Sequence, residues 1–156
     1  MIMIWEGYRV VKILSYDTNR IDELANIARG LQRQYSVPNS NTIADEDGVG
    51  GGVVDILRCK GFIGNERATG NYNNMRSECY FDLASKVNSN SIYIESKDER
   101  EQIVKELQYI KQVNFDKEQK LQVISKKDMP DSPDFADCLM MRMKFEKRGF
   151  VFMINC

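Results

Sequence analysis

A chain of 156 residues, 42% hydrophobic and 29% charged, has the size and composition of one globular domain, and this excludes a disordered or fibrous protein. Its formal net charge of −1 provides no general attraction to nucleic acid, so any such contact depends on local basic side chains. The chain has no histidine, which excludes serine–histidine and cysteine–histidine catalysis and histidine-bound metals. Carboxylates, lysines, tyrosines, thiols or a bound metal must carry any chemistry.

The sequence indicates a single domain over residues 1–156 in a reducing compartment. Its four cysteines form no C-x-x-C pair, so free thiols are expected. The apolar run at 1–5 is too short to cross a bilayer and lacks the features of a signal peptide. We therefore expect a cytoplasmic protein that does not contact membranes.

The first third of the chain predicts the order β-β-α-β-α. β-Branched and aromatic residues flank Gly7, which is typical of a hairpin, and apolar residues then recur at helical spacing after a cap at Asp17, Thr18 or Asn19. Gly61 is expected to close the second helix. The expected elements are strands at 2–5, 9–16 and 41–45 and helices at 17–35 and 53–60.

The rest of the chain predicts alternating helices and strands. Met75, Cys79, Leu83 and Val87 recur every four residues, as on one face of a helix. The last helix is expected to begin with Ser132 as its cap and with proline at its first position. The expected elements are helices at 75–87, 99–113 and 131–145 and strands at 91–96 and 120–127, with 149–156 as a strand or a docked tail.

Four glycines at 48 and 50–52 follow the strand at 41–45 and suggest either a phosphate-binding loop or a sharp turn. The lysine and hydroxyl of a Walker A loop are missing, because valines follow the glycines. A dinucleotide fingerprint fits poorly, since Val53 stands where the third glycine belongs. The glycines instead permit the chain to reverse close to Asp45, at the strand end where α/β sheets place ligands.

Two groups of carboxylates are candidates for a site, and each also has a simpler interpretation. Asp45 and its acidic neighbours Glu46 and Asp47 also suit a solvated turn. Asp134 and Asp137 are three residues apart on one helix face, where they either share a cation or complement the helix dipole. Together, the strand order and these two groups match the way a ribonuclease H-like nuclease assembles a site for Mg²⁺ or Mn²⁺.

The segments "ADEDGVGGGVVDIL", "GNYNNMRSECYFDLA", "KELQYI" and "SPDFADCLMM" resemble, in this order, the nuclease domain of the large terminase subunit of tailed bacteriophages. The resemblance covers nearly the whole chain. It implies a mixed ribonuclease H-like α/β sheet flanked by helices, and a phage- or prophage-encoded nuclease that cleaves double-stranded DNA with Mg²⁺ or Mn²⁺ during DNA packaging.

The resemblance makes Asp45 the second metal carboxylate and Asp134 the third, with Asp137 as a neighbouring candidate and Asp47 as a lesser one. In that family the first carboxylate lies on a strand that precedes the equivalent of residues 2–10. We therefore expect the first strand and its carboxylate to be missing here, and cleavage by this chain to be weak or absent.

The missing strand would be central in the sheet, so unpaired backbone groups are expected beside it. Rearrangement, a strand of a second copy or residues 149–156 would satisfy them. The resemblance also implies double-stranded DNA, an ATPase domain, the small terminase subunit and the portal as partners, although the ATPase motifs are absent from this chain.

Local basic residues are the candidates for DNA phosphate contacts. They are Arg58, Lys60, Arg67, Arg76, Lys126 and Lys127. Asn73, Asn74 and Arg76 are interpreted mainly as scaffold. Two other functions stay open: a docking module that binds DNA or packaging proteins without cleavage, and a nucleotide-binding domain that uses the glycines.

Overall fold

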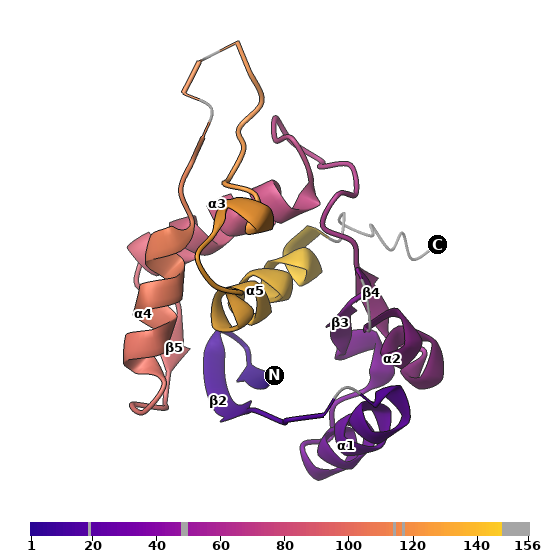
Figure 1. Ribbon diagram of the computed structural model, residues 1–156. Coiled ribbons are helices and arrows are strands. Elements are labelled where there is room, and N and C mark those ends of the chain that lie inside the picture. The colour runs from indigo at the N-terminus through magenta and orange to yellow at the C-terminus, as the bar shows by residue number, and fades with distance from the viewer. Residues whose placement is uncertain (19, 48–49, 114, 117, 148–156) are drawn as a thin grey trace, which may run out of the picture.

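The computed structural model describes every residue except 19, 48–49, 114, 117 and 148–156 (Figure 1). The predicted hairpin forms: β1 (Ile2–Glu6) pairs with β2 (Arg9–Leu14) in antiparallel fashion. The expected strand at 91–96 is short, and β5 (Tyr93–Ile94) pairs with β2 in parallel. The resulting sheet has the order β1-β2-β5.

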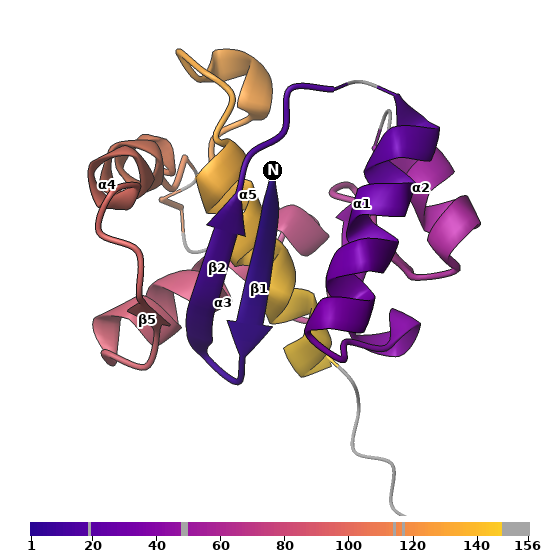
Figure 2. The ribbon, with the colours of Figure 1, turned by 90° about the horizontal axis from the view of Figure 1, so that it is seen from below.

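A second sheet lies in the other half of the molecule. Its two strands, β3 (Ile43–Asp45) and β4 (Lys60–Phe62), are parallel. The helices α1 (Ile21–Gln34) and α2 (Gly50–Leu57) pack together beside it around a small core of Ala25, Val53 and Leu57 (Figure 2). Among the described residues, β1 and β3 each lie at the edge of their sheet.

The central helix is α5 (Asp134–Met141), which contacts β1, β3, α3 (Met75–Asn88) and α4 (Arg100–Tyr109). In Figure 2, α3 and α5 lie behind β1 and β2. Leu139 and Met140 of α5 are at most 2% exposed and belong to the main core, together with Val10 of β2 and Cys79 of α3. Helix α5 therefore joins the two sheets into one body.

Two expected helices end at other residues than the sequence predicts, and α2 also begins at Gly50, three residues early. Helix α2 ends early, at a left-handed Arg58 (φ 50°), so Gly61 belongs to β4 instead of closing the helix. A Cβ on Gly61 would lie 1.6 Å from a Glu46 carboxylate oxygen, so a larger residue there would displace the exposed Glu46 side chain. Helix α4 stops at Tyr109, four residues before the expected end.

The strand expected at 120–127 is replaced by isolated bridges and a short 3₁₀ helix, η2 (Lys126–Asp128). Its backbone groups have scattered partners: Ser77 Oγ accepts from the Val123 amide at 3.3 Å, Arg76 donates to the Ile124 carbonyl at 2.7 Å, and backbone groups of residues 71–73 and 111–113 bond to others. A second 3₁₀ helix, η3 (Arg142–Lys147), follows α5. The strand or tail expected at 149–156 lies outside the described residues.

The helix caps also differ from expectation. Arg20 holds the cap position of α1 without a side-chain cap bond, and Thr18 Oγ1 accepts from the Arg20 amide at 3.3 Å, while Asn19 is not described. At α5, Ser132 donates to Asp134 instead of capping the helix, and proline 133 holds the cap position. No helix in the described part of the chain is long and apolar enough to cross a membrane.

Candidate metal and nucleic-acid site

Asp45 lies at the end of β3, close to the glycine at which α2 begins. A Cβ on Gly50 would lie 1.6 Å from the Asp45 carbonyl oxygen, so only glycine lets α2 begin this close to the strand. Asp45 Oδ1 accepts from the Asp47 amide at 3.2 Å, and Oδ2 lies 3.5 Å from Lys126 Nζ. Gly50 therefore serves the close backbone approach that the sequence indicates, but Gly50, Gly51 and Gly52 form the first turn of α2 instead of a turn before the helix.

Asp137 is placed by the N-terminal half of α5, and α4 sets the start of that helix. Glu106 Oε2 accepts from the amides of Phe135 and Ala136 at 2.7 and 3.0 Å. A buried carboxylate from a different helix thus satisfies the free N–H groups at the start of α5. The carboxylate of Asp137, whose residue is 7% exposed, is carried to the interior side of the helix.

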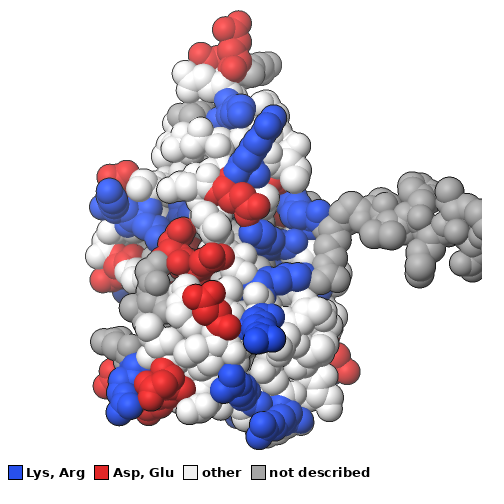
Figure 3. Space-filling model, turned by 90° about the vertical axis from the view of Figure 1, so that its right-hand side faces the viewer, with Lys and Arg blue, Asp and Glu red and all other residues white. Residues whose placement is uncertain are grey.

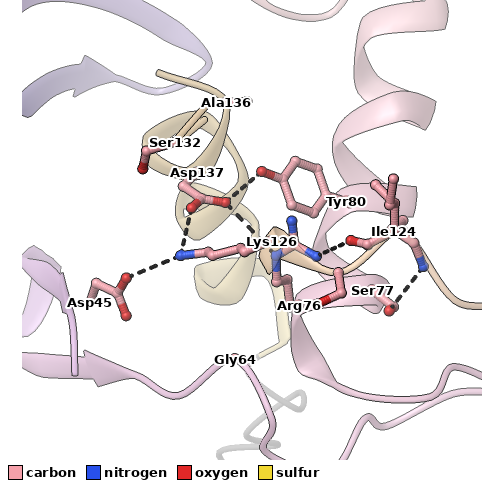
Figure 4. A network of polar contacts seen from close by, with 12 residues as sticks. Asp45, Gly64, Arg76, Ser77, Tyr80, Ile124, Lys126, Ser132, Ala136 and Asp137 are labelled. Carbon is pink, nitrogen blue, oxygen red and sulfur yellow. Dashed lines mark hydrogen bonds and ion pairs between the residues drawn. The ribbon is translucent and has the colours of Figure 1, made fainter. Parts of the chain in front are cut away.

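The two aspartates converge on Lys126 (Figure 4). Lys126 Nζ is 2.7 Å from Asp137 Oδ2 and 3.5 Å from Asp45 Oδ2. Partial burial alone would lower the pKa of Lys126, but the hydrogen bond and charge of Asp137, followed by the charge of Asp45, raise it overall. One oxygen of each carboxylate therefore points at a single positive charge.

The other oxygen of Asp137 is held by α3. Tyr80 donates its hydroxyl to Asp137 Oδ1 at 2.5 Å, and Arg76 Nε is 4.0 Å from the same oxygen. Burial, and then the adjacent charge of Asp137, raise the pKa of Tyr80, which keeps it a proton donor. The Arg76 guanidinium lies over the Tyr80 ring, 4.9 Å from its centroid.

Not all of the sequence-predicted residues meet at this point. Asp134 is exposed at the start of α5 and accepts from Ser132. Asp47 Oδ2 accepts from the Gly64 amide at 2.9 Å. Among the described residues, no group of three or more His, Cys, Asp or Glu side chains is arranged to hold a metal ion.

The predicted DNA contacts lie in different environments. Arg67, Arg58 and Lys127 are exposed, and Lys126 has a half-exposed side chain in the ion pairs described above. Arg76 is only 8% exposed and points into the protein. Asn74 caps α3 by accepting from the Ser77 amide at 2.9 Å, which is a scaffold role. On the face shown in Figure 3, acidic side chains near the middle are bordered by basic ones that continue to the lower edge.

Sequence reasoning missed two residues of this site, Tyr80 and Glu106. Both lie inside segments that carry the terminase resemblance, "GNYNNMRSECYFDLA" and "KELQYI". Their place in these segments was the one sequence feature that pointed to a role in the site. Their partners lie 57 and 29 to 30 residues away, so no local pattern predicts the contacts.

The donor set fits a hard divalent cation. Asp45 and Asp137 each direct one carboxylate oxygen at the same point, and the Lys126 ammonium shows that this point accommodates positive charge. Carboxylate oxygens are the ligands preferred by Mg²⁺ and Mn²⁺. Two protein oxygens suit an ion that keeps several water or phosphate ligands.

No protein-family model and no curated protein sequence matches this chain. Solved structures do match. The nuclease domain of the large terminase subunit gp2 of bacterial virus Sf6 is 22% identical, with a TM-score of 0.71 over 88% of this chain and 78% of that one. A point mutant of that nuclease domain with manganese gives 23% identity and a TM-score of 0.68, over 88% of this chain and 79% of that one.

A third structure, a mutant of the same phage protein with calcium, also gives 23% identity and a TM-score of 0.68, over 88% of this chain and 78% of that one. At these identities the likeness shows a shared fold. The mixed ribonuclease H-like α/β fold predicted from the sequence is thereby confirmed.

Proposed function

We propose that this chain is the nuclease domain of a phage large terminase subunit and that it cleaves phosphodiester bonds of double-stranded DNA in a metal-dependent reaction. The observation that supports this most is the convergence of Asp45 Oδ2 and Asp137 Oδ2 on one point at the end of β3. In a chain with this fold, that point is where a hydrolytic site is expected.

Asp45 and Asp137 would hold Mg²⁺ or Mn²⁺ through their Oδ2 atoms. Such a cation stabilises the charge of the phosphate and lowers the pKa of bound water. The sequence resemblance implies that Asp134 is a further metal ligand. Asp134 is exposed and lies three residues from Asp137 on α5, so the test compares its variant with those of Asp45 and Asp137.

Other residues would bind and orient the DNA. Lys126 pairs with both carboxylates in the described structure and, once released, is close enough to them to pair with a phosphate. Arg67 and Lys127 are exposed and suit contacts with the backbone. Phosphate contacts carry no base information, so cleavage is expected to show little sequence preference.

We expect cleavage by this chain alone to be weak. The described residues bring together two carboxylates and no larger acidic group. A cation with only two protein ligands is held loosely. A misplacement of about 1 Å in such a site lowers the rate about a hundredfold.

The test is Mn²⁺ titration by calorimetry, with plasmid nicking measured in the same buffers. The variants are Asp45→Asn, Asp137→Asn and, as a matched control on the same helix, Asp134→Asn. The geometry predicts that the first two lose more than about tenfold in Mn²⁺ affinity and that the third keeps it. An unaltered protein that binds no Mn²⁺ would refute the proposal.

A docking module without cleavage is the second candidate, because the Lys126 ammonium already occupies the point on which both aspartates converge. That function predicts DNA binding that is unchanged in Asp45→Asn, together with no Mn²⁺ dependence. The same titration distinguishes the two candidates.

The partners proposed for the nuclease are double-stranded DNA and, in the packaging machine, an ATPase domain, the small terminase subunit and the portal. A second copy of the chain is a further candidate, at the edge strands β1 and β3. This setting would be the cytoplasm of a bacterial host.

A further inference from the structure

The two oxygens of Asp137 face different surroundings (Figure 4). Oδ2 accepts from Lys126 at 2.7 Å and shares that contact with Asp45. Oδ1 accepts from the Tyr80 hydroxyl at 2.5 Å, and both residues are at least nine-tenths buried. The carboxylate is therefore divided between an inner side that belongs to α3 and an outer side that belongs to the site.

Arg76 reinforces the inner side. It donates one hydrogen bond, to the Ile124 carbonyl, and its guanidinium lies over the Tyr80 ring. Within the described part of the chain, its Nε and Nη2 atoms are buried and have no hydrogen-bond partner. Nε lies 4.0 Å from Asp137 Oδ1 in an ion pair without a hydrogen bond, so the Arg76 charge faces the oxygen that Tyr80 already holds.

Helix α3 also holds the segment that leads to Lys126. Ser77 accepts from the Val123 amide, and Arg76 binds the next residue, Ile124. One turn of α3 thus fixes both the inner oxygen of Asp137 and the approach of Lys126. These contacts fix the relative position of Asp137 and Lys126. Packing of the core alone would not require this.

We propose that Tyr80, supported by Arg76, is a positioning residue that retains Oδ1 of Asp137 and leaves Oδ2 as the single oxygen offered to the cation. This inference rests on the proposed metal-dependent function. It assigns Asp137 as a one-oxygen ligand whose direction is set by α3. Hydrogen bonds of this kind behind a ligand orient it and strengthen binding.

The test compares Tyr80→Phe with Tyr8→Phe. Both remove one hydroxyl that donates to a carboxylate: Tyr80 to Asp137 at 2.5 Å, and Tyr8 to Glu146 at 2.7 Å, which lies outside the site. Mn²⁺ affinity is measured from the electron paramagnetic resonance signal of free Mn²⁺, at a temperature where circular dichroism shows all proteins folded.

We expect Tyr80→Phe to bind Mn²⁺ about 10- to 100-fold more weakly and Tyr8→Phe to bind as the unaltered protein does. Plasmid nicking by Tyr80→Phe should recover when Mn²⁺ is raised above its new dissociation constant. A purely structural role would lower the melting temperature and leave the affinity unchanged.

Three results are distinguishable. Weak binding in Tyr80→Phe alone supports the inference. Equal binding by Tyr80→Phe and the unaltered protein overturns it and leaves the proposed function intact. Absence of Mn²⁺ binding in the unaltered protein overturns the proposed function and this inference with it.

Discussion

At the scale of the residue, Lys126 is the internal counter-charge of the candidate site. Its ammonium lies between two carboxylates, one buried on α5 and one half-buried at the end of β3. Because water screens a side chain that is 46% exposed, this ion pairing stabilises the folded state less than pairing of a buried lysine would. The same exposure allows the Lys126 side chain to move away from the two carboxylates without disturbing the core.

Replacing this lysine should make the protein less stable and more responsive to metal. Lys126→Met keeps the apolar stem and removes the charge, so the buried Asp137 loses a charged partner, at a cost of about 1 kcal/mol. Added Mn²⁺ should then raise the melting temperature of Lys126→Met more than that of the unaltered protein, since no ammonium competes for the carboxylates. Calorimetric melting curves measure both effects.

The exposed neighbour provides the control. Lys127→Met removes the same charge one residue away, and its melting curves with and without Mn²⁺ should match those of the unaltered protein. Identical Mn²⁺ responses in Lys126→Met and Lys127→Met would contradict the view of Lys126 as the counter-charge.

At the scale of the elements, Glu78 ties α3 to the loop before it and to η3 after α5. Its residue is 2% exposed and accepts from the Thr69 amide at 2.7 Å, from the Thr69 hydroxyl, and from Lys147 at 3.0 Å. Burial alone would raise the pKa of Glu78, but the bonds from Thr69 and Lys147 outweigh it and lower the pKa.

This lowered pKa predicts a pH-dependent stability. Because the folded pKa lies below the unfolded one, the stabilisation is full above the usual glutamate pKa and is lost as the pH falls through the folded pKa. Glu78→Gln should cost about 2 kcal/mol at neutral pH, and the difference from the unaltered protein should narrow in acid. Urea unfolding at a series of pH values measures it.

Glu66→Gln is the matched control for Glu78→Gln, because Glu66 also pairs with a lysine of η3, Lys144, but at the surface, with a side chain 44% exposed. Glu66→Gln should change the free energy of unfolding only slightly at every pH. A Glu78→Gln difference that stayed constant from neutral pH into acid would contradict the assignment.

At the scale of the whole molecule, the candidate site lies where the two sheets meet through α5. Asp45 comes from the β3–β4 half, and Asp137 comes from the helix that contacts both β1 and β3. Under the proposed function, exposed basic residues near this junction would bind DNA although the net charge of the chain is −1. The electrostatic part of binding is therefore expected to come from a few local contacts.

The salt dependence of DNA binding tests this. If Arg67 and Lys127 each neutralise one phosphate, Arg67→Gln and Lys127→Gln should each reduce the slope of log affinity against log salt by about 0.9. Arg100→Gln, at the first residue of α4 and outside the proposed contacts, should leave it unchanged. Fluorescence anisotropy over a salt series gives the slopes, and equal slopes in all three variants would refute these contacts.

The local features of this protein could be predicted from its sequence. Helical spacing of Met75, Cys79 and Leu83 indicates α3, and the short apolar strand before the glycines places Asp45 at a strand end, although three of the glycines form the first turn of α2. Such features depend on neighbours within a few residues. The order of the elements, read with the terminase resemblance, was enough for the fold class.

Tertiary structure alone decided how the site is assembled. Asp45 and Lys126 are 81 residues apart in the chain, and Tyr80 and Asp137 are 57 apart, so no periodicity connects them. The cap of α5 likewise comes from Glu106 on another helix, although the sequence offers Ser132 nearby. The sequence by itself determined which carboxylates were available, whereas packing across α3, α4 and α5 decided that Asp137 turns inward and Asp134 stays in solvent, because direction on a helix becomes burial only when neighbouring elements cover one side.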